Sequence, residues 1–233
     1  MQKPKPSSTA FRSLTLQAVM LAITLFASLG MAQADYIPAI TFSSYSDSNA
    51  TSDSTRGYNF DVTAPVYVAG LSIFDAGGNG LAESHEVGLW NSAGTLLASV
   101  LIDSGTTNSL DSSGKFRYML LNSVLSLAVD TGYRVGGFFL NESLDIQAFN
   151  IPSIATATGI SFMGGASVEN SILAFPSDDL TFPNIRSLPG GSLLLTDSPV
   201  PEPATLPLLA AGVLFGLAGR RVTKRRQHTT SGG

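Results

Sequence analysis

The segment between residues 39 and 195 consists of short stretches of alternating apolar and polar residues, separated by turns rich in glycine, asparagine and serine. Alternation puts every second side chain on one face of a strand, whereas an amphipathic helix needs apolar residues three or four positions apart. The stretches span 39–45, 57–62, 65–75, 86–91, 95–103, 115–121, 125–129, 132–140, 159–163 and 192–195. They predict an all-β fold, and their number and spacing favour a jelly-roll-like β-sandwich.

Two details sharpen this prediction. The turn Asn91-Ser92-Ala93-Gly94 separates the stretches 86–91 and 95–103, which predicts a β-hairpin. Alternating apolar residues mark the side chains expected to point inward: Tyr58, Phe60, Val62, Val66, Val68, Leu71 and Ile73. Phe116, Tyr118 and Leu120 are expected to share one face of their strand.

The C-terminal segment has three parts in a fixed order. The triplet Pro201-Glu202-Pro203 is followed by an uncharged run, 204–219, and by a basic cluster. A bilayer-spanning helix needs roughly 20 apolar residues, and extension to residue 222 brings the run to marginal spanning length. We therefore predict a single transmembrane helix over 204–222, followed by a basic tail, 220–226, that stays on the cytoplasmic side. The basic residues are Arg220, Arg221, Lys224, Arg225 and Arg226.

Residues 1–34 have the pattern of a secretory signal peptide, with a basic start, an apolar stretch over 14–29 and small residues at its end. Ala32 and Ala34 form the small-residue cleavage site, so Asp35 is the expected first residue of the mature protein. An uncleaved N-terminal anchor is the alternative interpretation. The expected order is a signal peptide (1–34), an exported domain (35–195), a linker (196–200), a sorting segment (201–226) and a disordered end (227–233).

The exported part is acidic. Residues 35–199 contain 16 acidic and five basic residues, a net charge of −11, although the whole chain has a formal charge of −4. This balance argues against a nucleic acid partner, because such binding depends on basic contacts. The chain has no cysteine, which excludes cysteine catalysis and thiolate metal sites.

The C-terminal segment resembles the PEP-CTERM sorting signal of Gram-negative bacteria that make exopolysaccharide and biofilm. Residues 200–206, the leucine- and alanine-rich run and Arg220-Arg221 carry the resemblance; Pro207 departs from it, since a helix former is more usual there. The resemblance implies processing by an exosortase, after signal peptidase has removed the leader. It also implies a body in the periplasm, held by the inner membrane, and later a location at the cell surface, the outer membrane or the extracellular matrix.

The body is also similar to a bacterial exported domain of unknown function. Tyr58–Val62, Val68–Leu71, Val87–Trp90, Gly94–Ala98 and Tyr133–Gly136 carry this second resemblance. Relatives of that domain resemble jelly rolls and occur in carbohydrate-associated and PEP-CTERM proteins. The resemblance transfers no catalytic residue.

The densest polar stretch, 75–86, suggests a calcium loop as the one cofactor site. Asp75, Asn79 and Glu83 could supply the oxygen ligands that calcium prefers, with glycines allowing a tight backbone. A glycine-rich loop with solvated acidic residues is the alternative interpretation. His85 is the one histidine of the exported part, too few for an ordinary zinc site, and is expected to make hydrogen bonds in a loop.

Trp90 could bind a sugar, as part of an aromatic platform with Tyr118, Tyr133, Phe138 and Phe139. The alternating pattern makes these rings candidates for the core as well. Paired carboxylates for hydrolysis could come from Asp178-Asp179 or Glu83 and Glu86, but neighbours on a strand point to opposite faces. No G-x-S-x-G turn presents a serine nucleophile.

These patterns favour a non-enzymatic surface or matrix protein associated with exopolysaccharide. A carbohydrate-binding module of the cell surface is the first alternative, and a secreted hydrolase is the second.

The two processing events predict the ends of the mature protein. We expect mass spectrometry of the protein from its native host to find Asp35 as the first residue and an end near Pro201-Glu202-Pro203. Recovery of a chain that keeps both Met1 and Gly233 would contradict this prediction.

Overall fold

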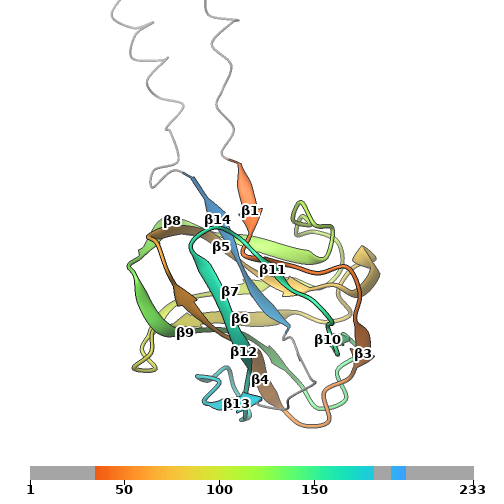
Figure 1. The fold of residues 1–233 in the computed structure, drawn as a ribbon. Helices are drawn as coiled ribbons and strands as arrows, with labels where there is room; N and C mark the ends of the chain where they lie inside the picture. Colours follow the sequence, from red (N-terminus) through yellow and green to blue (C-terminus); the bar gives the residue numbers. More distant parts are fainter. Residues whose placement is uncertain (1–34, 181–189, 198–233) are drawn as a thin grey trace, which may run out of the picture. The chain divides into compact units, whose positions relative to one another are not determined.

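The described part of the chain is an all-β sandwich, as predicted. A computed structural model describes residues 35–180 and 190–197 (Figure 1). The signal peptide with Ala32 and Ala34, the sorting triplet, the predicted transmembrane helix, the basic tail and the end 227–233 lie outside these residues. Within the described ranges, no helix has the length and apolar character needed to cross a bilayer.

Two antiparallel sheets form the sandwich, and two short strand pairs border them. The six-stranded sheet has the order β13 (Asp178–Leu180), β12 (Ile160–Glu169), β4 (Ser54–Val62), β9 (Asp130–Phe139), β6 (His85–Trp90) and β7 (Leu96–Ile102). The four-stranded sheet has the order β1 (Tyr36–Pro38), β14 (Gly191–Thr196), β5 (Val66–Phe74) and β8 (Phe116–Leu127). The short pairs are β3 (Ser46–Ser48) with β10 (Gln147–Phe149), and β2 (Ile40–Thr41) with β11 (Ala155–Thr156).

The chain passes repeatedly from one sheet to the other, which is the jelly-roll-like feature of the fold. β4 belongs to the six-stranded sheet, β5 to the four-stranded sheet, β6 and β7 to the first again, and β8 to the second. A short 3-10 turn, η1 (Ala76–Gly78), follows β5. Strands distant in sequence therefore become neighbours, as when β14 inserts between β1 and β5.

The core lies between the sheets, where the sequence pattern placed it. Tyr58, Phe60 and Val62 of β4 are buried, with polar or charged residues between them. In β5, Val66 and Val68 alternate in the same way, but the next inward residue is Leu71, three positions after Val68, and Ile73 follows it. The pairing of β5 with both neighbours shifts between Val68 and Gly70, so an extra residue, Ala69, restores the inward direction.

The two sheets approach each other closely at glycines of β9 and at Gly190 and Gly191, where β14 begins. A Cβ atom added to Gly191 would lie 2.7 Å from the carbonyl carbon of Gly136, a distance that real atoms do not tolerate. A Cβ atom on Gly190 would overlap the ring of Phe139, and one on Gly137 would overlap the side chain of Ile73. Absence of side chains at these positions therefore sets the distance between the sheets.

The predicted hairpin is confirmed as β6 and β7. Asn91 organises its turn, because the side-chain oxygen accepts hydrogen bonds from the amides of Ala93 and Thr95 at 3.1 and 2.9 Å. Gly94 adopts a φ of 77°, which glycine reaches without strain.

Several strand boundaries differ from the predictions. The stretches 115–121 and 125–129 form one strand, β8, whose pairing with β5 is irregular rather than broken. Phe116, Tyr118 and Leu120 share a face, but Leu120 is 41% exposed on it. Only Ile40–Thr41 of the stretch 39–45 forms a strand, β2. The stretch 159–163 is longer than predicted, because β12 continues to Glu169. Thr196, which the sequence placed in the linker, is buried in β14.

The glycine contact predicts an unusually damaging small substitution. We expect Gly191→Ala to lower the free energy of unfolding by about 2–3 kcal/mol, because overpacking of a filled core costs this much. Urea denaturation measures the change. Ser99→Ala, on the exposed side of β7, is the control and should change stability by less than about 0.5 kcal/mol. Equal stability of the two variants would show that the sheets separate easily at this point.

Candidate functional site

A group of buried polar side chains surrounds His85. This residue begins β6 and is 1% exposed. Its Nδ1 lies 2.8 Å from the carbonyl oxygen of Phe138, and its Nε2 lies 2.9 Å from Oδ2 of Asp145. The ring of Phe139 packs against the imidazole with centroids 4.7 Å apart. His85 makes hydrogen bonds, as expected, but from a buried strand rather than a surface loop.

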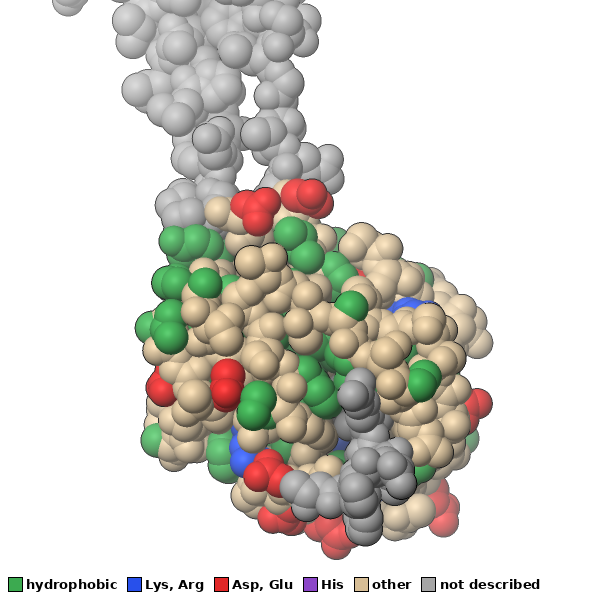
Figure 2. Space-filling model, in the orientation of Figure 1, with side chains coloured by type: hydrophobic (Ala, Val, Ile, Leu, Met, Phe, Trp, Pro, Cys, Tyr) green, Lys and Arg blue, Asp and Glu red, His purple; other side chains and the backbone are tan. Residues whose placement is uncertain are grey.

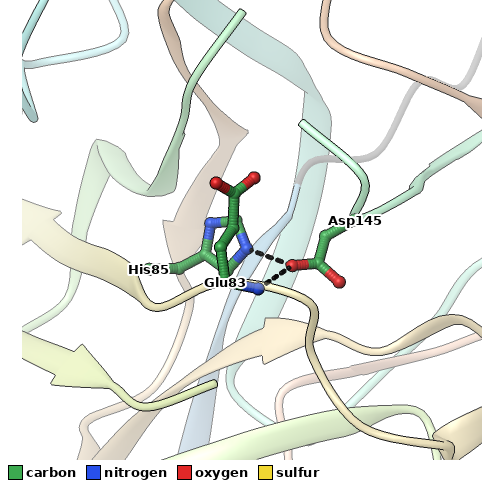
Figure 3. A group of neighbouring side chains, drawn as sticks. All are labelled: Glu83, His85 and Asp145. Carbon is green, nitrogen blue, oxygen red and sulfur yellow. Dashed lines mark hydrogen bonds and ion pairs between the residues drawn. The ribbon is translucent and has the colours of Figure 1, made fainter. Parts of the chain in front are cut away.

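Asp145 connects the loop after β9 to the loop before β6 (Figure 3). It follows β9, and its carboxylate accepts hydrogen bonds from the amides of Ala82 and Glu83 at 2.8 and 3.0 Å, in addition to the bond with His85. Burial by itself would raise the pKa of Asp145, but the bonds from His85, Ala82 and Glu83 outweigh burial and lower this pKa. Asp145 is therefore held as a carboxylate.

Glu83 completes the group. Its carboxylate accepts a hydrogen bond from the hydroxyl of Ser143, and the amide of Asp145 donates to the same hydroxyl oxygen at 3.2 Å. One ligand atom from each of Glu83, His85 and Asp145 lies within 4.8 Å of the others. The residue types, two carboxylates and one imidazole, are ones that bind divalent metals in proteins.

Asp75 forms an ion pair with Arg117, so the three residues predicted to bind calcium do not come together. Its Oδ2 lies 2.6 Å from Nε of Arg117, and both side chains are almost fully buried. The same oxygen accepts a hydrogen bond from the amide of Gly80 at 3.0 Å. Asn79 is exposed, and Glu83 lies with His85 instead of with Asp75.

Arg117 connects this loop to its neighbour. Its guanidinium donates to the carbonyl oxygens of Asn108 and Gly78, at 2.6 and 3.0 Å, as well as to Asp75. A buried arginine with all these partners is satisfied. The loop that the sequence suggested for a metal is thus held by an ion pair within the protein.

A hollow of about 280 Å³ lies beside these groups and includes Asp75, Asn79, Leu144 and Asp145 in its lining. Asp145 therefore borders both the hollow and the group around His85. Another hollow, of about 500 Å³, lies near the ends of β1 and β14, and Asp197 is its one charged lining residue. The hollow of about 280 Å³, which two carboxylates line, is therefore the better candidate for binding a charged ligand.

Trp90 does not offer its ring to a sugar. It is 3% exposed and packs edge-on against Phe175, with ring centroids 6.4 Å apart. Tyr133 and Phe139 are buried as well, which agrees with the core interpretation of these aromatic residues. The proposed aromatic platform is therefore largely interior.

The other suggested carboxylate pairs are separated as well. Asp179 of β13 forms an ion pair with Arg134 at 2.9 Å, whereas Asp178 accepts a hydrogen bond from Ser177. Glu86 is exposed, while Glu83 lies in the group around His85. Sequence reasoning missed Asp145 and Ser143, which no local pattern connects to a histidine 60 residues earlier.

Two family models match the chain. A domain of unknown function (DUF4082) matches residues 41–184, and a PEP-CTERM protein-sorting motif matches residues 199–225. Both matches confirm the resemblances found in the sequence. Searches of curated proteins and of solved structures found no match. The sorting motif implies an exported protein that an exosortase processes, held transiently in the membrane and then placed at the cell surface.

The pair of His85 and Asp145 predicts a sensitive position. We expect Asp145→Asn to lower the free energy of unfolding by about 3 kcal/mol, because asparagine carries no charge and keeps one acceptor oxygen for the three groups that Asp145 binds. Urea denaturation at neutral pH measures this change. Asp178→Asn is the control, since Asp178 is exposed, and should have little effect.

The lowered pKa of Asp145 gives this comparison a pH dependence. A carboxylate whose pKa is lower in the folded state stabilises the fold above the ordinary carboxyl pKa, and the contribution is lost as the pH falls. The stability difference between the parent chain and Asp145→Asn should therefore shrink on acidification. A difference that grows on acidification would contradict the assignment.

Proposed function

The chain belongs to the family of the domain of unknown function DUF4082, and from this premise we propose that it is a non-enzymatic surface or matrix protein associated with exopolysaccharide. The observation that carries the proposal is the sorting motif at residues 199–225, directly after the last strand of the sandwich. Bacteria that use such signals make exopolysaccharide, and the motif delivers proteins to the surface where that polymer lies.

The fold supports display at a surface. β14 runs from Gly191, which pairs with Ile73 at the end of β5, to Thr196, which pairs with Tyr36. The described segment thus begins and ends at one end of the four-stranded sheet. The loop after β5, with Asp75 and the neighbouring hollow, lies at the other end of that sheet. A chain held through its C-terminus would leave these loops free to meet partners.

The surface chemistry also supports a matrix role. Acidic side chains are spread over the visible face and basic ones are few (Figure 2). Such a surface repels nucleic acid, which we do not expect as a partner, and keeps an exported protein soluble. Cations could bridge the anionic groups of the polymer and the acidic side chains of this surface.

We expect the body to have no enzymatic activity. The carboxylates that the sequence offered for hydrolysis lie in separate places: Asp179 is paired with Arg134, Glu83 lies beside His85, and Glu86 is exposed. His85 has both ring nitrogens engaged and contacts no serine hydroxyl by a hydrogen bond within the described residues. Burial of Trp90 likewise gives the alternative of a carbohydrate-binding module no specific support.

Cell fractionation tests the sorting step. We expect replacement of Pro201, Glu202 and Pro203 by alanine to retain the protein in the inner membrane fraction, whereas the parent chain reaches the surface or the medium. Deletion of residues 227–233, outside the matched motif, is the control and should leave sorting unchanged. Normal sorting of the alanine variant would contradict dependence on the motif.

A second comparison tests the association with polymer. In cells that cannot make exopolysaccharide, the processed protein should move from the matrix fraction to the free medium. An unchanged distribution would contradict the association, even if the sorting experiment succeeds.

A further inference from the structure

In the group of Glu83, His85 and Asp145, one imidazole lies beside two carboxylates. The carbonyl oxygen of Phe138 only accepts hydrogen bonds, so Nδ1 of His85, 2.8 Å away, carries a hydrogen. Nε2 then faces the carboxylate of Asp145 at 2.9 Å. Either an imidazole hydrogen, as in the hydrogen bond described above, or a metal cation can bridge these two atoms.

The charges around this point favour a cation of higher charge. Glu83 and Asp145 bring two carboxylates to the group. Among the described residues, no lysine or arginine forms an ion pair with either of them, because the two arginine pairs involve Asp75 and Asp179. A second hydrogen on His85 neutralises one negative charge. A divalent metal bound to a neutral imidazole neutralises both.

We propose that Glu83, His85 and Asp145 bind a divalent transition metal, with zinc as the reference ion. Zinc lies about 2.0–2.2 Å from imidazole nitrogen and carboxylate oxygen, so ligand atoms arranged tetrahedrally around it are about 3.4 Å apart. Nε2 and Oδ2 are 2.9 Å apart and need to separate by about half an ångström to admit the ion, while Glu83, whose contact is with a hydroxyl, moves toward them. The three side chains leave one coordination position for water or another ligand.

The surrounding contacts are those of a prepared metal site. A metal-binding histidine usually donates its other ring hydrogen to a carbonyl or a carboxylate, and Phe138 supplies such a carbonyl. The amides of Ala82 and Glu83 hold the carboxylate of Asp145 in place. The ring of Phe139 restrains the imidazole from one side. Asp145 also lines the hollow of about 280 Å³, which gives an ion a route to the group.

The ligand set distinguishes zinc from calcium. Calcium takes six to eight oxygen ligands, whereas this group offers one nitrogen and two carboxylates. The site also differs from the calcium loop suggested by the sequence, since it keeps Glu83 but replaces Asp75 and Asn79 by His85 and Asp145. We therefore expect zinc to bind and calcium to bind much more weakly.

Titration calorimetry of the full chain, purified without a polyhistidine tag and freed of metal by a chelator, tests the proposal. We expect one zinc ion per chain, a higher melting temperature with zinc than with chelator, and no comparable effect of calcium. Glu83→Gln is the decisive variant because Glu83 is only partly buried, so the fold should survive, and zinc affinity should fall at least about tenfold. Elemental analysis of the dialysed protein provides an independent readout.

Two further variants make the result specific. Glu86→Gln changes an exposed carboxylate next to His85 in β6 and should leave zinc affinity unchanged. His228→Gln removes the other histidine of the chain and should leave the stoichiometry at one. Absence of zinc binding, equal affinity of Glu83→Gln and the parent chain, loss of binding in His228→Gln, or preference for calcium would each overturn the proposal.

Discussion

The close contact between β9 and β14 sets the geometry on which the rest of the sandwich depends. Gly191 lies against the backbone of Gly136 and Gly137 without an intervening side chain, and this lets backbone approach backbone across the core. Phe139 lies directly under Gly190, and the same ring packs on the imidazole of His85. A wider separation would release Phe139, and the buried histidine would lose the surface that holds its ring in place.

Polar side chains then hold the loops at this part of the fold. Asp145 connects the segment after β9 to the loop before β6, while Arg117 connects the loop after β5 to the one before β8. Each is a buried charged group with several partners, and such groups favour one loop arrangement over others because any rearrangement leaves a charge unsatisfied. The loops contain little regular structure, so these two anchors largely determine their conformation.

The sequence predicted the sandwich well because alternation is a local property. Tyr58, Phe60 and Val62 each report the direction of their own strand, and the hairpin was visible in the turn at Asn91. Order of strands within the sheets was not predictable, since the insertion of β14 between β1 and β5 joins segments more than 100 residues apart. The shift at Ala69 was recognisable only from the three-residue step between Val68 and Leu71.

The group around His85 was less predictable for the same physical reason. Glu83 and His85 were noticed because they lie in one polar stretch, but Asp145 comes from a loop 60 residues later and its neighbourhood has no motif. Asp75 belongs to the same stretch and has the same chemistry as Glu83, yet its partner is Arg117. Which carboxylate joins which cation depends on the sheet packing, and composition of the loop does not reveal it.

The position of β14 determines how the folded body would respond to mechanical load. This strand leads directly to the C-terminal segment, and it is hydrogen-bonded to β1 on one side and to β5 on the other. A pull applied beyond Thr196 would act along the strand, so its ladder bonds would be loaded together in shear rather than broken one at a time. A protein fastened at that end and exposed to flowing liquid would thus resist drag through a strand that is hydrogen-bonded on both sides.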